Sequence, residues 1–88
     1  MTAKEMFEKL GYEDETAKFH HLIRFVKHTN YSGLKVDKII ELELNGCEIL
    51  LTCYYGKDDR GPFHLTDKEL QAINKQVEEL GRLNENNK

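Results

Sequence analysis

The sequence predicts an α+β fold: a short N-terminal helix, a three-stranded antiparallel β-meander, and a longer C-terminal helix packed on one sheet face. Three observations predict it, namely a capping-box pattern near each end, a hairpin signal in the middle, and apolar alternation on both sides of that hairpin. At 88 residues the chain is long enough for one small domain, which we place at 1–88. A domain of this size has little volume for an enclosed substrate cavity.

The first helix is predicted from Thr2 and Glu5, because the Thr hydroxyl and the Glu carboxylate can each satisfy a free backbone N–H of a first turn. Gly11 stands where a left-handed residue would end this helix after about two turns. The acidic link 13–15 is expected to be a solvated turn. The apolar side of the helix consists of Met6, Phe7 and Leu10.

Three strands are predicted at 19–27, 36–44 and 47–55, with a loop at 29–33 between the first two. In the first strand, Phe19, Ile23 and Phe25 are expected on one face and Leu22 and Val26 on the other. Asn45-Gly46 between the second and third is the dipeptide that favours a type I′ turn, since both central residues need positive φ. Residues 56–61 are expected to be a polar loop.

The turn fixes a register for the central hairpin. Pairing Leu44 with Cys47 places on one face the pairs Leu42–Ile49, Ile40–Leu51, Lys38–Cys53 and Val36–Tyr55, nearly all apolar. The other face pairs Glu43–Glu48, Glu41–Leu50, Ile39–Thr52 and Asp37–Tyr54, which is mixed. A slip by one residue would exchange the faces, so the hydrophobic pattern and the turn favour the same register.

The second helix is predicted from Thr66 and Glu69, which form another capping-box pattern, and Leu65 and Leu70 stand at the positions of a hydrophobic staple. Its apolar stripe is Leu70, Ile73, Val77 and Leu80, with Gly81 as the C-terminal cap. The tail 82–88 is expected to fray.

Candidate sites for chemistry are weak. Cys47 and Cys53 are six positions apart on one strand, about 20 Å, so they cannot form a disulfide and are expected to be free core thiols in a reducing cytosol. The histidines His20, His21, His28 and His64 lack a metal-ligand spacing, and we expect structural or surface roles. We therefore predict no catalytic residue, no metal, no cofactor and no identifiable small-molecule substrate.

The charge disfavours two classes of partner. There are 13 Lys and Arg against 16 Asp and Glu, a net charge of -3, and the lysines are scattered. Neither nucleic acid nor an anionic membrane surface is favoured by this balance. The N-terminus is no signal peptide and no stretch is apolar enough to span a bilayer, so we expect a cytoplasmic protein.

The mixed hairpin face is the candidate interaction surface. The apolar side chains Ile39, Leu50 and Tyr54 lie close together there, rimmed by Glu41, Glu43 and Glu48. They require coverage by the first helix, by a second copy or by a protein partner, and the acidic rim favours a basic partner. The alternative is a small metal-dependent hydrolase or nuclease that uses Glu43, Glu48, Asp58 and Asp59.

The two ends also carry a resemblance. TAKEMFEKLGYE and LTDKELQAINKQVEELG resemble small uncharacterised phage and prophage proteins of Gram-positive bacteria, which join such a start and finish around a variable β-rich middle. The likeness covers about a third of the chain, and Arg82 stands where those relatives commonly carry Trp. It implies a phage-related accessory protein in the bacterial host cytoplasm and carries no known activity.

Overall fold

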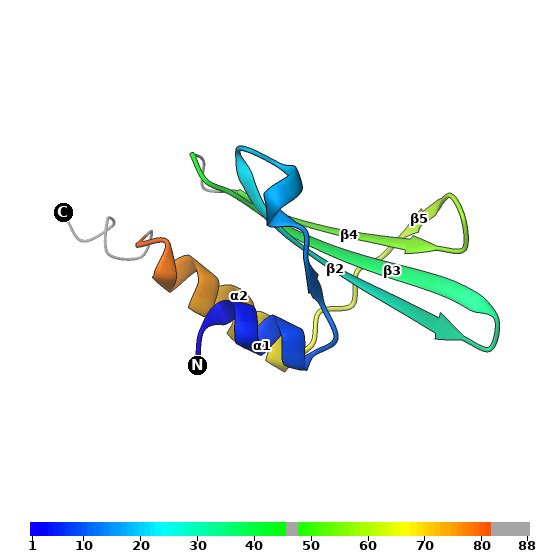
Figure 1. Cartoon of the computed structure of the whole chain (residues 1–88). Coiled ribbons are helices and arrows are strands. Elements are labelled where there is room, and N and C mark those ends of the chain that lie inside the picture. Colours follow the sequence, from blue (N-terminus) through cyan, green and yellow to red (C-terminus); the bar gives the residue numbers. More distant parts are fainter. Residues whose placement is uncertain (46–47, 82–88) are drawn as a thin grey trace.

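The computed structural model describes residues 1–45 and 48–81. These residues form two α-helices, five β-strands and one 3-10 helix (Figure 1). The chain therefore has the predicted α+β class. In order, the elements are α1 Ala3–Lys9, β1 Glu13–Asp14, η1 Thr16–Lys18, β2 Leu22–Tyr31, β3 Leu34–Glu43, β4 Ile49–Tyr55, β5 Asp59–Gly61 and α2 Asp67–Glu79.

The strands form one antiparallel sheet in which each pairs with the next along the chain. The predicted meander is present as β2, β3 and β4. The predicted count of three strands is too low, because the sheet has one further short strand at each edge. β1 occupies the acidic segment expected as a turn, and β5 lies in the expected polar loop. Strands of two and three polar residues carry no apolar alternation, so that pattern cannot predict them.

The register of the central hairpin is confirmed for the described residues. Leu42 pairs with Ile49, Ile40 with Leu51, Lys38 with Cys53 and Val36 with Tyr55. On the other face Glu41 pairs with Leu50, Ile39 with Thr52 and Asp37 with Tyr54, while Glu43 N–H donates to the Glu48 carbonyl at 3.2 Å. The predicted Leu44–Cys47 pair and Asn45-Gly46 turn involve residues 46 and 47, which lie outside the described ranges.

The first hairpin is longer than predicted. β2 and β3 pair along ten residues each, from Leu22 opposite Glu43 to Tyr31 opposite Leu34. The predicted bounds 19–27 and the loop 29–33 are therefore wrong. The chain reverses at Ser32 and Gly33, whose φ angles are 51° and 87°. Both angles suit a two-residue hairpin turn, and Ser-Gly is a weaker signal of it than Asn-Gly because Ser adopts positive φ less readily.

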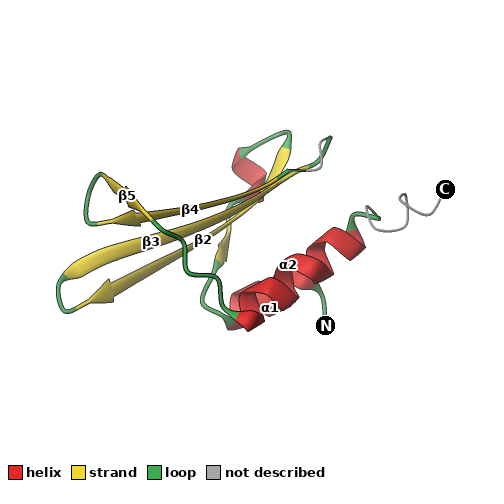
Figure 2. Ribbon diagram, turned by 180° about the vertical axis from the view of Figure 1, so that it is seen from behind, coloured by secondary structure: helices red, strands yellow, loops and turns green. Residues whose placement is uncertain are grey.

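Both helices pack on the same face of the sheet, which we call the helix side (Figure 2). The opposite face, which we call the open face, is therefore not covered by α1. Phe7 of α1 stacks on Phe25 of β2 with ring centroids 4.1 Å apart. The buried core cluster consists of Phe7, Tyr12, Phe25, Ile40, Leu42, Ala72 and Ile73.

Both predicted capping boxes are present, at Thr2 with Glu5 and at Thr66 with Glu69. The predicted stripe of α2 is wrong at its first member, since Leu70 is 44 % exposed. The buried positions are instead Glu69, Ala72, Ile73 and Gln76, a spacing of three, one and three that still defines one helical face.

The sheet is longer than the helices that cover it. In Figure 1 the hairpin end between β2 and β3, and the β4–β5 end, extend beyond α1 and α2. None of the described helices is long and apolar enough to cross a membrane. The tail 82–88, including Arg82, lies outside the described residues.

Candidate functional site

The apolar residues of the predicted interaction surface lie together on the open face. Leu50 pairs with Glu41, while Ile39 and Tyr54 have the same side-chain direction by the alternation of the strands. Leu50 is 58 % exposed, whereas Ile39 and Tyr54 are half-buried. β5 pairs only with Cys53–Tyr55, so Leu50 belongs to a part of β4 whose outer edge pairs with no described strand. A large apolar side chain is thus presented to solvent at a sheet edge.

The acidic rim is only partly as predicted. Glu41 forms an ion pair with Arg24, with Oε2 2.6 Å from Nη1. Glu43 and Glu48 are exposed, and among the described residues neither has an ion-pair partner. At the far end of the patch the Arg60 guanidinium lies 5.7 Å from the Tyr54 ring centroid. The Glu43 and Glu48 end of the patch is therefore negative, while at the other end Arg60 and Asp37 both lie opposite Tyr54.

The segment from β1 to η1 covers the β2 side of the open face. Arg24 Nε lies 3.2 Å from Glu15 Oε1, and its guanidinium carbon lies 5.1 Å from the Phe19 ring centroid. The predicted placement of Phe19 on a strand face with Phe25 is wrong, because Phe19 precedes β2 and lies against Arg24. The segment and not α1 thus shields part of this face.

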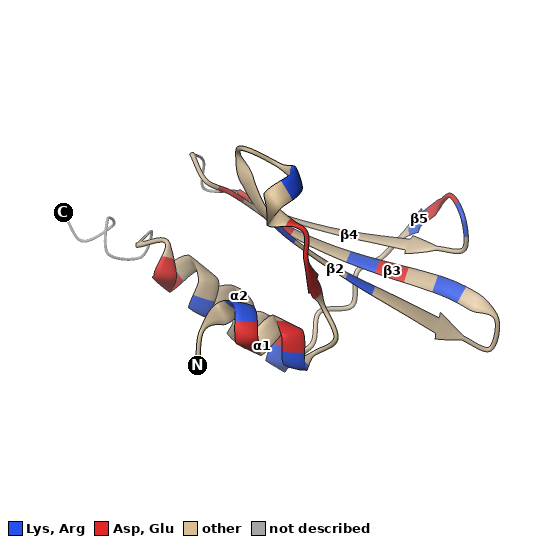
Figure 3. Cartoon of the chain, viewed as in Figure 1, with Lys and Arg blue, Asp and Glu red and all other residues tan. Residues whose placement is uncertain are grey.

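One cluster with metal-ligand chemistry lies beside it. Ligand atoms of Glu13, Glu15 and His28 are within 4.8 Å of one another, and Figure 3 shows that β1 is wholly acidic. His28 Nδ1 lies 2.7 Å from Asp37 Oδ1, and Glu15 also lies 3.5 Å from Lys18 Nζ. Partial burial raises the pKa of Glu15, but the bond from Arg24 and the Lys18 charge outweigh it, so this pKa is lowered. A cation would have to displace two basic groups from Glu15. The acidic run 13–15 is visible in the sequence, where a solvated turn is favoured over a cation site, but only the pairing of β1 with β2 brings His28 beside it.

The four carboxylates of the alternative hydrolase or nuclease do not form one cluster. Glu43 and Glu48 lie at one end of β4, and Asp58 and Asp59 follow its other end. The seven residues of β4 at about 3.3 Å each separate the two pairs by roughly 20 Å, too far to share one ion.

The structure contains a buried polar network on the helix side that the sequence does not predict. Glu69 Oε2 accepts from Tyr12 Oη at 2.5 Å and from Lys38 Nζ at 2.6 Å. Burial raises the pKa of Glu69, but hydrogen bonds from Lys38, Tyr12 and Thr66 outweigh it, and the pKa lies below its usual value. The sequence does contain one signal, since Lys38 is the single charged member of the otherwise apolar register set.

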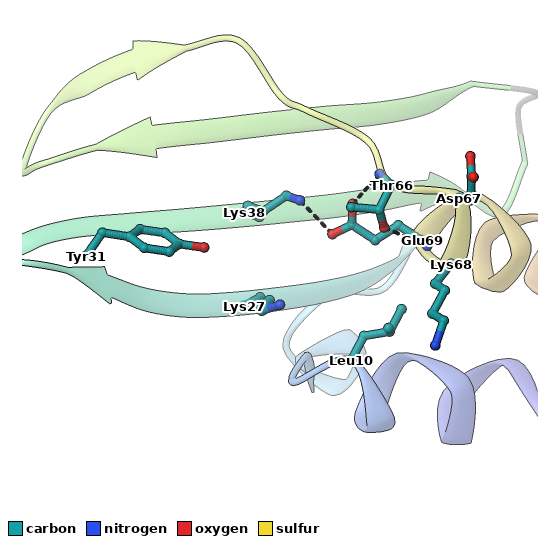
Figure 4. Close-up of a pocket in the computed structure, with 8 residues that line it drawn as sticks. All are labelled: Leu10, Lys27, Tyr31, Lys38, Thr66, Asp67, Lys68 and Glu69. Atoms are coloured by element: carbon teal, nitrogen blue, oxygen red, sulfur yellow. Dashed lines mark hydrogen bonds and ion pairs between the residues drawn. The ribbon is translucent and has the colours of Figure 1, made fainter.

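This network borders a hollow of about 520 Å³ on the helix side, beyond the ends of the helices (Figure 4). A second hollow, of about 260 Å³, shares Tyr31 and Lys38 with the first. Cys53, a free and buried thiol as predicted, lines the second one, whereas Cys47 lies outside the described residues. The first hollow is lined by Leu10, Lys27, Tyr31, Lys38, Thr66, Asp67, Lys68 and Glu69. The second adds Leu34, Val36, Cys53, Tyr55 and His64.

Comparisons with protein-family models, curated proteins and solved structures give no match to this chain. The resemblance of the two ends to phage and prophage proteins therefore stays a prediction.

Proposed function

We propose that the protein is a non-enzymatic interaction module, a phage- or prophage-related accessory protein of the host cytoplasm that binds a protein partner through the open face. One observation carries this proposal: Leu50 is 58 % exposed on a sheet face that both helices leave free. Ile39 and Tyr54 extend the apolar surface, and Arg24 and Glu41 border it. An apolar centre with a charged rim is the usual composition of a protein-binding surface.

The charges favour a basic partner. Glu43 and Glu48 are adjacent across the ladder, so two negative charges stand at one end of the patch. Like charges directly opposite each other weaken a hairpin, and a partner's Lys or Arg between them would remove that repulsion. We therefore expect the partner to place an apolar side chain on Leu50 and a basic one near Glu48.

The test compares two exposed leucines. Leu50→Ser and Leu70→Ser alter similarly exposed positions, one on the open face and one on α2. Each variant and the wild type is immobilised and incubated with a lysate of a Gram-positive bacterium, and captured proteins are quantified by mass spectrometry. A partner specific to the open face should be lost with Leu50→Ser and retained with Leu70→Ser. The double variant Glu43→Lys, Glu48→Lys should lose it as well.

Folding is checked by thermal unfolding. Both serine variants should unfold cooperatively with a free-energy change within about 0.5 kcal/mol, as is usual for exposed positions. Equal capture by Leu50→Ser and wild type overturns the assignment of the surface. If the Leu50→Ser variant no longer unfolds cooperatively, Leu50 is part of the core and not of a free surface.

A further inference from the structure

We propose that the two hollows on the helix side, which share Tyr31 and Lys38, bind an anion that carries an aromatic or apolar group, through Lys27, Lys38 and Lys68 at one end and Tyr31 and Leu34 at the other. The shared chemistry is a phosphate or carboxylate attached to an apolar body. This inference does not rest on the open face, which is the other side of the sheet.

The charge of the larger hollow is the first argument. Lys27, Lys38 and Lys68 come from β2, β3 and α2, yet they line one hollow in a chain whose net charge is -3. Glu69 balances Lys38. Within residues 1–45 and 48–81 neither Lys27 nor Lys68 has an ion-pair partner. Asp67 also lines the hollow, but Figure 4 shows its carboxylate directed away from both lysines. Uncompensated positive charge remains for a ligand.

Two of the three lysines, Lys27 and Lys38, have contacts that restrict them, whereas Lys68 is exposed. Lys27 Nζ lies 5.9 Å from the Tyr12 ring centroid. Lys38 Nζ bonds Glu69 and the His64 carbonyl and lies 4.5 Å from the Phe63 ring centroid. A group fixed before binding loses less conformational entropy when the ligand arrives.

The N-terminus of α2 is partly occupied by its own capping box. The hydroxyl of Thr66 already accepts the Glu69 N–H, and the Glu69 carboxylate accepts the Thr66 N–H. The lysine side chains supply the positive charge of the hollow.

The smaller hollow supplies the apolar half. Tyr31 is 62 % and Leu34 48 % exposed, although both lie on the face that the helices cover elsewhere. Buried Val36 and Cys53 and half-buried Tyr55 also line it, beside Lys38 and His64. A bare anion would leave this surface in water, and a neutral apolar molecule would leave the lysines without a counter-charge. A ligand with both groups satisfies both ends.

The test uses small probes and amide chemical shifts. The ¹⁵N-labelled protein is titrated with phenyl phosphate and with N-acetylphenylalanine, which present a phosphate and a chain-end carboxylate. Three control compounds each lack one of the two groups. Inorganic phosphate has no apolar group, while benzyl alcohol and N-acetylphenylalanine amide have no anionic group. We expect at least one of the two complete probes to saturate shifts at Lys27, Tyr31 and Lys68, with each half-probe about tenfold weaker or more. The probe that binds identifies the anion source.

Variants localise the binding. The double variant Lys27→Gln, Lys68→Gln should weaken the complete probe about tenfold, and Tyr31→Ala should weaken it several-fold. Lys57→Gln removes an exposed lysine of the β4–β5 turn and should leave affinity within about twofold. Melting curves confirm that each variant is folded. Equal losses in Lys57→Gln and the double variant, equal binding of a half-probe, or no saturable shift with either complete probe would overturn the proposal.

Discussion

Lys38 Nζ lies 2.6 Å from Glu69 Oε2, joining the middle strand of the sheet to the first turn of α2. The Glu69 side chain is 3 % exposed, and the Tyr12 hydroxyl donates to the same oxygen at 2.5 Å. One carboxylate therefore connects β3, α2 and the segment after α1. It also holds Lys38 at the boundary shared by the two hollows.

Replacing Lys38 by Met should be strongly destabilising. The carboxylate of Glu69 would remain buried without its counter-charge, which typically costs about 3 kcal/mol or more. Urea unfolding at neutral pH measures this. The double variant Lys38→Met, Glu69→Gln should be less destabilised than the sum of the two single variants, because it leaves no buried charge. Additive losses would contradict an energetic coupling between the two residues.

Acid should weaken the protein through Glu69. Because the folded-state pKa of Glu69 is lowered, the folded chain binds this proton less readily than the unfolded chain. The stabilisation is therefore present above the unfolded pKa of about 4.3 and is lost as pH falls through the folded pKa. The free energy of unfolding of wild type should fall below about pH 4.5 more steeply than that of Glu69→Gln. Parallel curves for the two proteins would rule out this contribution, since the remaining carboxylates are common to both.

Alkali should act through Tyr12. Burial, and then the bond to the Glu69 carboxylate, raise the pKa of the Tyr12 phenol far above its usual value. A raised pKa contributes stability that is full below the unfolded value of about 10 and is lost as pH rises through the folded value. In a spectroscopic tyrosinate titration, Tyr12 should ionise only with unfolding. Tyr12→Phe should lose less stability above about pH 10, and at neutral pH it should cost about 1.5 kcal/mol for the missing hydrogen bond.

The parts of the fold that the sequence predicts are those set by local rules. The Thr2 and Thr66 capping boxes and the register of Ile40 with Leu51 depend on residues close in the chain or on alternation, and all three are confirmed. β1 and β5 depend instead on pairing with β2 and β4. Short polar strands acquire their structure from a neighbour, so no pattern of their own predicts them.

The candidate sites also divide into one that local rules predict and one that only the contacts between distant segments create. Alternation places Leu50 on the same face as Tyr54, and the exposure of Leu50 follows once both helices lie on the other side. The basic hollow is not predictable in this way, because Lys27, Lys38 and Lys68 are far apart in sequence and scattered in the charge pattern. Only the three-dimensional arrangement of β2, β3 and α2 brings them to one place.

The β2–β3 turn should respond to backbone preference alone. Gly33 has a φ of 87°, and a Cβ there would meet no atom within 4 Å. Gly33→Ala should therefore cost about 1 kcal/mol through conformation and not through a clash. Gly33→Asn should cost less, because Asn adopts positive φ more readily. Urea unfolding of the two variants provides the measurement. Equal losses of unfolding free energy in the Ala and Asn variants would mean that the preference for positive φ at position 33 does not determine the cost.

The thiol of Cys53 should be protected by the fold. Cys53 is buried on the helix side of β4, opposite Lys38, and it lines the smaller hollow. In a Cys47→Ser background, which leaves one thiol to follow, reaction with a disulfide reagent should be slow and should accelerate in urea with the unfolded fraction. Cys53→Ser should cost about 1–3 kcal/mol, since its hydroxyl would be buried without a dedicated partner, and Cys53→Ala should cost less than Cys53→Ser. Rapid reaction of the native protein would contradict this protection and would show that the smaller hollow admits the reagent to the Cys53 sulfur.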